Sequence, residues 1–131
     1  MNRAKDWLTQ AHYDIQAAES ARKSGFHEWA CFMAQQASEK ALKATAQNRN
    51  AVLWGHSLKE MLMALKENCE IDLADNLMER ARNLDKYYII ARYPNGFNTG
   101  IPHDYFGEKD SEDAINSAKI LIQWCDSLET R

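Results

Sequence analysis

Apolar residues recur every three or four positions along most of this 131-residue chain, the spacing of an α-helix with one buried face. Four long stretches carry the pattern: residues 3–23, residues 26–48, a stretch from residue 72 to just before Pro94, and residues 110–128. Side chains expected to face inward are Ala4, Leu8, Ala11, Ile15, Ala18 and Arg22, then Trp29, Met33, Ala37, Ala41 and Ala44, then Leu73, Leu77, Ala81, Leu84, Tyr88 and Ala91, and finally Ile115, Ala118, Ile122, Cys125 and Leu128.

A shorter helix is predicted over residues 58–68. Ser57 and Glu60 have the spacing of a capping box, in which the hydroxyl and the carboxylate each accept a free backbone amide at the helix start. Asp72 is expected to cap the long helix that follows, and Pro94 to end it, because the residue before a proline is driven out of helical geometry. The aromatic-rich segment 93–107 is then a long loop, a feature that is usually functional or interfacial.

The elements together predict an all-α fold, since alternation typical of strands is nowhere sustained. We expect an up-and-down bundle of four long helices plus one short helix, forming a single domain over residues 1–131. Hydrophobic residues make up 45% and charged residues 27%, the balance of an ordinary globular protein that needs no metal or disulfide to fold.

The formal net charge of −3 argues against broad, non-specific binding of nucleic acid but is compatible with a local basic patch. Cys31, Cys69 and Cys125 are far apart and form no CxxC pair, so we expect free thiols in a reducing compartment rather than a zinc site. No signal-peptide pattern and no long apolar run is seen, which favours a cytoplasmic protein without membrane contact.

A polar block at residues 35–44 interrupts the row of alanines in the second helix. Gln36, Lys40 and Lys43 share one side, and Glu39 and Lys43 have the favourable spacing for an ion pair. Polar groups beside a packed seam need partners. A structural bridge to the first helix, to Asp14, is the favoured interpretation, and a ligand pocket is the alternative.

Two further groups of residues have side chains suited to binding or catalysis. His56 precedes the capping box, and we interpret it as a packed or hydrogen-bonded residue more readily than as an acid–base catalyst. Arg92 and the tyrosines around it, including Tyr93, can hold a phosphate and stack on bases, or can equally form the edge of an aromatic core. No histidine has metal-site spacing, and no phosphate-binding glycine loop or nucleophile elbow occurs, so neither metal nor cofactor is expected.

The chain resembles the HEPN (higher eukaryotes and prokaryotes nucleotide-binding) family. The resemblance lies in residues 11–18, 34–44, 55–58 and 84–94, and its most specific parts are the Gln-Gln-Ala-x-Glu-Lys-x-x-Lys-Ala block and the Arg-Tyr-Pro turn at 92–94. It implies a helical bundle and a homodimer, and in prokaryotes a frequent partner, a minimal nucleotidyltransferase encoded alongside. Many members are metal-independent ribonucleases whose arginine is followed after four to six residues by a histidine. Here ten residues separate Arg92 from the next histidine, His103.

The leading hypothesis is a dimeric module that binds nucleotide or RNA and pairs with a nucleotidyltransferase in a toxin–antitoxin-like system. Arg92 would hold phosphate, Tyr93 would stack, and Lys40, Lys43 and His56 would be secondary contacts. A metal-independent ribonuclease, with Arg92 and His103 as its catalytic residues, is one alternative. A purely structural interaction protein is the other.

Overall fold

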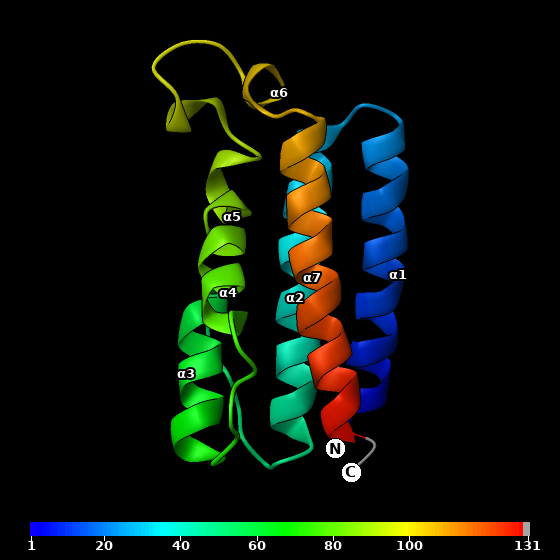
Figure 1. Ribbon diagram of the computed structural model, residues 1–131, viewed down its shortest axis with the longest axis vertical. Helices are drawn as coiled ribbons and strands as arrows, with labels where there is room; N and C mark the ends of the chain where they lie inside the picture. Colours follow the sequence, from blue (N-terminus) through cyan, green and yellow to red (C-terminus); the bar gives the residue numbers. More distant parts are fainter. Residues whose placement is uncertain (130–131) are drawn as a thin grey trace.

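The computed structural model describes residues 1–129, and these form helices and connecting segments with no strand. The helices are α1 (Ala4–Lys23), α2 (His27–Gln47), α3 (Leu58–Asn68), α4 (Leu77–Asp85), α5 (Tyr87–Ile90), α6 (Pro102–Tyr105) and α7 (Glu108–Glu129), with a 3-10 turn η1 (Pro94–Gly96). The three longest, α1, α2 and α7, run side by side along the molecule, and α3, α4 and α5 flank them (Figure 1). The all-α class is confirmed.

Helix α2 is the centre of the bundle. It contacts α1, α7, α3, α4, α5 and α6, and it is buried around most of its circumference. Its alanines make this possible, because small side chains let neighbouring helices approach closely. The wholly or almost wholly buried alanines of α2 are Ala30, Ala34, Ala37, Ala41, Ala44 and Ala46.

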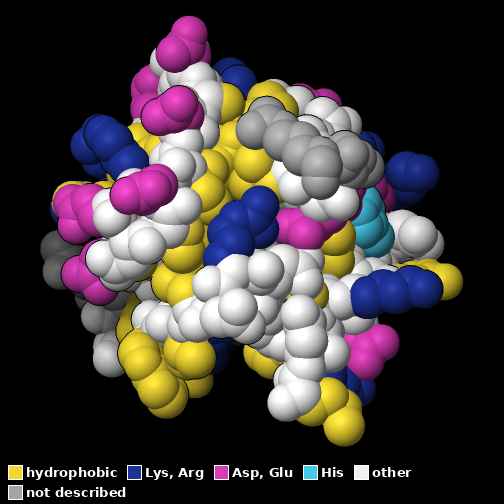
Figure 2. Space-filling model, turned by 90° about the horizontal axis from the view of Figure 1, so that it is seen from below, with side chains coloured by type: hydrophobic (Ala, Val, Ile, Leu, Met, Phe, Trp, Pro, Cys, Tyr) yellow, Lys and Arg dark blue, Asp and Glu magenta, His cyan; other side chains and the backbone are white. Residues whose placement is uncertain are grey.

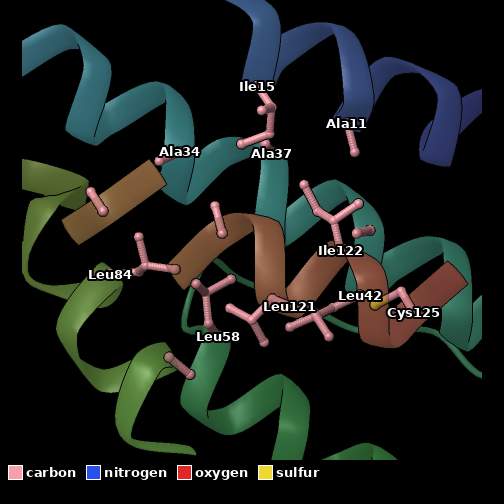
Figure 3. Packing of buried hydrophobic residues seen from close by; sticks show 14 of the residues in the cluster. Ala11, Ile15, Ala34, Ala37, Leu42, Leu58, Leu84, Leu121, Ile122 and Cys125 are labelled. Carbon is pink, nitrogen blue, oxygen red and sulfur yellow. The ribbon is translucent and has the colours of Figure 1, made fainter. Parts of the chain in front are cut away.

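Side chains from α1, α3, α4 and α7 meet those of α2 in one hydrophobic core. In Figure 3, Ala11 and Ile15 reach from α1 toward α2 and α7, while Leu58 and Leu84 meet Leu121 on the opposite side of α7. Most residues predicted to face inward are buried here. The exceptions include Trp29, which lies largely at the surface, because α2 turns this side of its first turns away from α1 and α7.

The predicted fourth long helix is wrong in its start and its continuity. Asp72 is exposed and caps no helix among the described residues. Helix α4 begins at Leu77, after Asn76 in the left-handed conformation. Leu73 packs against the core from a non-helical segment instead. A break at Lys86 then separates α4 from α5. After α3 ends, the chain runs back along the bundle as an irregular segment, and α4 begins only beyond it (Figure 1).

The predicted long loop contains two short helical turns, η1 and α6, and is ordered by its own aromatic rings. Phe97 stacks on Tyr105 with ring centroids 4.1 Å apart, and Phe106 packs edge-on against Tyr87 of α5. The Tyr105 hydroxyl donates to the Thr99 carbonyl at 2.6 Å. These contacts make the segment a compact surface loop whose side chains supply its own packing.

The start of α3 has a cap that the sequence pattern predicts and a second one that it does not. The Ser57 hydroxyl accepts from the Glu60 amide at 3.2 Å, which is one half of the predicted capping box; among the described residues the Ser57 amide makes no return bond to the Glu60 carboxylate. Asp85, at the end of α4, accepts from the Leu58 amide at 2.8 Å, from the Lys59 amide at 3.1 Å and from the Ser57 hydroxyl at 3.3 Å. A carboxylate at a helix N-terminus also complements the helix dipole, so Asp85 ties α4 to α3.

The cysteines are free thiols, as expected. Cys31 and Cys125 lie in the core, and burial raises the pKa of each to about 12, so neither ionises readily near neutral pH. Within the described residues, no helix is both long enough and apolar enough to cross a membrane.

Asp85→Ala should lower the free energy of unfolding by about 1–2 kcal/mol, because three donors at the start of α3 lose their acceptor. Urea unfolding followed by circular dichroism measures this change. Asp72→Ala is the matched control and should stay within about 0.5 kcal/mol of wild type, since this exposed carboxylate caps no helix. Equal losses in the two variants would contradict the assigned cap.

Candidate functional site

One stripe of α2 faces α5, α6 and the segment before α3. Its members are spaced by four, three and four residues, which places them on a single side of the helix. They are Glu28, Phe32, Gln35 and Glu39. Glu28, Gln35 and Glu39 are buried, and each is paired with a group from outside α2.

Arg92 lies over Phe32 of this stripe, within a set of three aromatic rings. Its guanidinium carbon is 4.4 Å from the centroid of Phe32, 4.7 Å from that of Tyr88 and 5.0 Å from that of Tyr93. Its Nε donates to the Tyr88 carbonyl at 2.8 Å. The faces of aromatic rings attract a cation, so this geometry stabilises the charge without neutralising it. We call Arg92 and these three rings the Arg92 cage.

The charge of the Arg92 cage is not balanced by a carboxylate from residues 1–129. Its two terminal nitrogens make no hydrogen bond with the described residues. Tyr93 is about half exposed beside them. An arginine oriented in this way can receive a bidentate anion such as a phosphate, with a ring next to it for stacking.

His56 stacks on the same Tyr88 ring, with centroids 4.4 Å apart and planes 18° from parallel. Its Nδ1 lies 2.9 Å from Oε1 of Glu39, while the Gln35 amide donates to the His56 carbonyl at 2.9 Å. The His56 side chain is 51% exposed and that of Glu39 only 8%. The hydrogen-bonded interpretation of His56 is thus right, and Tyr88 connects this histidine to Arg92.

His103 is held in the same manner by Glu28, which lies about three turns closer to the N-terminus of α2 than Glu39 does. Its Nδ1 lies 2.8 Å from Oε2 of Glu28, a carboxylate that is 8% exposed, and its ring is 56% exposed. Glu28 and Phe32 are one helical turn apart, so the partners of His103 and of Arg92 lie about 6 Å from each other on α2. His103 and Arg92 therefore lie against the same face of α2, although ten residues separate them in the sequence.

The two lysines lie away from the Arg92 cage. Lys40 Nζ pairs with Asp14 at 2.5 Å, which is the bridge to α1 that the sequence analysis favoured. Lys43 Nζ pairs with Glu39 at 3.2 Å, as its spacing predicted. Of the five predicted ligand residues, Arg92 contacts Tyr93 directly and is joined to His56 through Tyr88. Lys43 is linked to this group only through Glu39.

The sequence analysis missed the buried carboxylates of Glu28 and Glu39 as partners of the histidines, and it did not foresee that Tyr88 lies between His56 and Arg92. The spacing of Glu28, Phe32, Gln35 and Glu39 was the available signal, because a charged residue recurring on a helical stripe needs compensation. Among the described residues, no cluster of histidine, cysteine and carboxylate side chains could hold a metal ion.

Comparison with known proteins identifies relatives over almost the whole chain. The model of the HEPN domain family matches residues 4–128. The crystal structure of TT1696 from Thermus thermophilus has 38% sequence identity and a TM-score of 0.92, covering 97% of this chain and 98% of that one. ST0689, described as an archaeal HEPN homologue, has 33% identity and a TM-score of 0.82, with 98% of both chains covered.

A third solved structure, an HEPN domain protein from Thermotoga maritima, has 30% identity and a TM-score of 0.77, covering 96% of this chain and 98% of that one. No curated protein matches. The similarity to the three structures extends over the whole bundle and includes the elements that carry the Arg92 cage.

Proposed function

The chain belongs to the HEPN domain family, and from that premise we propose that it is a dimeric module that binds nucleotide or RNA and pairs with a minimal nucleotidyltransferase in a toxin–antitoxin-like system. The observation that supports binding is the Arg92 cage, in which a cation has aromatic partners but no carboxylate among residues 1–129. The nucleotidyltransferase partner is an expectation from the family, and a small nucleotidyltransferase in the neighbouring reading frame would support it.

In this proposal Arg92 holds a phosphate and Tyr93 stacks on the adjoining base. Base–aromatic stacking contributes about 1–3 kcal/mol per base and tolerates any sequence, so the ligand is single-stranded RNA or a nucleotide rather than a duplex. His56 is a secondary contact, because its exposed edge lies beside Tyr88 and Nδ1 is occupied by Glu39. Lys40 and Lys43 contribute less here, since each is already paired with a carboxylate.

The dimer part of the proposal is supported by large apolar side chains gathered on the elements that surround the Arg92 cage. Those at least two-fifths exposed on the first turns of α2, on α5 and on the loop up to α6 are Phe26, Trp29, Ile89, Tyr93, Ile101 and Tyr105. Partly exposed apolar side chains on neighbouring elements are typical of a surface that another molecule covers. A second copy of the chain covering this face would bring two Arg92 cages close together.

Arg92→Ala should weaken the binding of a short fluorescently labelled RNA at least about tenfold. It should also reduce the slope of the logarithm of the binding constant against the logarithm of the salt concentration by about one, because one phosphate contact is lost. Fluorescence anisotropy across a salt series measures both quantities. Arg82→Ala is the matched control, because Arg82 is exposed on α4 with no ion-pair partner among the described residues. If wild type shows no binding of RNA, ATP or GTP at millimolar concentration, alone and with the partner, the binding proposal fails.

Ile89→Asp should convert the dimer into a monomer, because it places a charge in the proposed apolar interface. Multi-angle light scattering at micromolar concentration measures the mass. Met63→Asp, a change at an exposed methionine of α3, should leave the dimer intact. A monomeric wild-type protein would rule out the dimer, and a dimeric Ile89→Asp variant would place its interface elsewhere.

Ribonuclease activity is a second candidate, favoured by the anchoring of His103 and Arg92 one turn apart on α2. Nε2 of His103, which has no hydrogen-bond partner among the described residues, would take the proton of a 2′-hydroxyl, whose oxygen attacks the neighbouring phosphorus. The bond from phosphorus to the 5′-oxygen breaks, water protonates that oxygen, and a 2′,3′-cyclic phosphate remains. Arg92 would stabilise the charge on the phosphorane, and Glu28 would orient the imidazole.

Under this second candidate, the protein cleaves single-stranded RNA in the presence of EDTA, and His103→Ala slows cleavage by about 10²–10⁴-fold. Gel analysis of a labelled RNA measures the rate. His12→Ala is the control, since His12 pairs with Asp126 on the side of α1 and α7. Equal rates for His103→Ala and wild type would remove His103 from any mechanism.

A further inference from the structure

A groove at the end of the bundle where α2 finishes takes no part in the Arg92 cage. It lies between the start of α1, the end of α2 and the segment that follows α2, and its volume is about 490 Å³. Figure 2 views this end of the molecule, where hydrophobic side chains reach the surface between charged ones. The lining residues that matter here are Arg3, Trp7, Lys43, Val52, Leu53 and Trp54.

The walls of the groove are held in place by hydrogen bonds and packing. On one side, the Arg3 amide donates to Oε1 of Gln47 at 2.8 Å, which fastens the chain before α1 to the end of α2. On the other side, the Ala51 amide donates to the Ala46 carbonyl at 2.9 Å, and Leu53 packs against the core. The groove is thus a feature of the fold rather than a gap between loose segments.

The segment after α2 that forms one wall has a backbone without partners. Residues 51–54 have no regular secondary structure. Leu53 packs inward while Val52 and Trp54 are 68% and 84% exposed, which is the alternation of an extended chain. The amides of Val52, Leu53 and Trp54 form no hydrogen bond with residues 1–129. Another extended chain can pair with such a backbone, so this wall favours a peptide as the ligand.

Trp54 is the side chain of the groove that is most available to a partner. Its ring lies almost entirely in water, and Trp7, which is partly buried on α1, lines the same groove. Tryptophan is enriched among the residues that contribute most of the binding free energy at protein interfaces, because it buries a large area at little cost in conformational entropy. The groove is therefore suited to a large apolar side chain of the partner.

The charge of the lining favours an acidic partner, because Arg3 and Lys43 line the groove and no carboxylate does. Arg3 is paired with Asp6 at 3.0 Å, but both side chains are more than three-fifths exposed, and such surface pairs are weak. A carboxylate of a partner can therefore compete for this guanidinium. Lys43 keeps its link to Glu39 and still offers two further donors.

A second copy of the chain fits this groove poorly. Two grooves placed face to face would bring Arg3 and Lys43 of one copy against the same cations of the other, and like charges across an interface repel. A contact between the groove of one copy and a different face of the next would be head-to-tail, and such contacts build open filaments unless the rotation closes a ring. A segment of a different protein meets neither difficulty.

We propose that this groove binds an extended, acidic segment of another protein. A large apolar side chain of that segment lies against Trp7 and Trp54, and its carboxylates lie beside Arg3 and Lys43. Lys43 is eleven residues beyond Phe32 on α2, or ~16 Å along the helix axis. The groove is thus separate from the Arg92 cage, and the proposal does not rest on RNA binding.

Selection from a displayed library of random linear peptides on the immobilised full chain tests the proposal. Soluble Trp54→Ala protein is present in excess as a competitor, so that only peptides that depend on Trp54 are retained. The retained sequences should carry several Asp or Glu residues around an aromatic or branched apolar residue. No enrichment over the library, or enrichment of neutral or basic sequences, overturns the proposal.

A retained peptide, synthesised with a fluorescent label, then gives affinities by anisotropy. Trp54→Ala should weaken its binding at least about tenfold, because Trp54 is the expected anchor, whereas Trp54→Phe should retain most of it. Arg3→Ala should weaken binding several-fold, and so should replacing the peptide's carboxylates by amides. Tyr13→Ala and Lys59→Ala, at an exposed aromatic and an exposed lysine outside the groove, are the matched controls and should bind like wild type.

Further outcomes distinguish this groove from other occupants and from the Arg92 cage. Circular dichroism confirms that each variant is folded. Trp54→Ala should leave the mass in light scattering and the affinity for RNA unchanged. A lower mass for Trp54→Ala would make a second copy the occupant and overturn the proposal. Equal losses of peptide affinity in Trp54→Ala and Tyr13→Ala, or equal affinity for the acidic peptide and its amide version, would overturn it too.

Discussion

The burial of α2 is the constraint on which the rest of the structure depends. A helix enclosed by six others cannot leave its polar side chains to water, so each must find a partner from a neighbouring element. On the sides that meet α1 and α7, α2 carries alanines, which need no polar partner. On the remaining side Glu28, Gln35 and Glu39 stay polar, and the elements packed there supply the compensating groups.

The candidate site is a consequence of that compensation. Glu28 and Glu39 each hold a histidine whose ring is about half exposed, and Phe32 between them supports a guanidinium through its ring face. An imidazole fixed by a buried carboxylate and an arginine without a carboxylate partner among residues 1–129 are groups suited to phosphate chemistry. The packing of the central helix therefore places the two histidines and the arginine along the same side of that helix.

Charge is distributed unevenly over this surface, although the chain as a whole is acidic. Lys40 and Lys43 are paired within the fold, and Arg92 depends on aromatic rings instead. Local pairing of this kind, rather than net charge, decides where an anion can approach. It leaves the Arg92 guanidinium, near the start of α2, without a carboxylate partner among the described residues.

The sequence by itself determined the helical class, the bounds of the three longest helices to within a few residues, the Ser57 cap and the pairing of Lys43 with Glu39, because all of these depend on neighbours a few positions apart. The tertiary structure alone decided the late start of α4, the capping of α3 by Asp85, and the contact of His103 with Glu28 across 75 positions. Periodicity shows which side of a helix is buried. It cannot show which distant segment packs there, since many pairings bury similar apolar area and only the assembled bundle selects one.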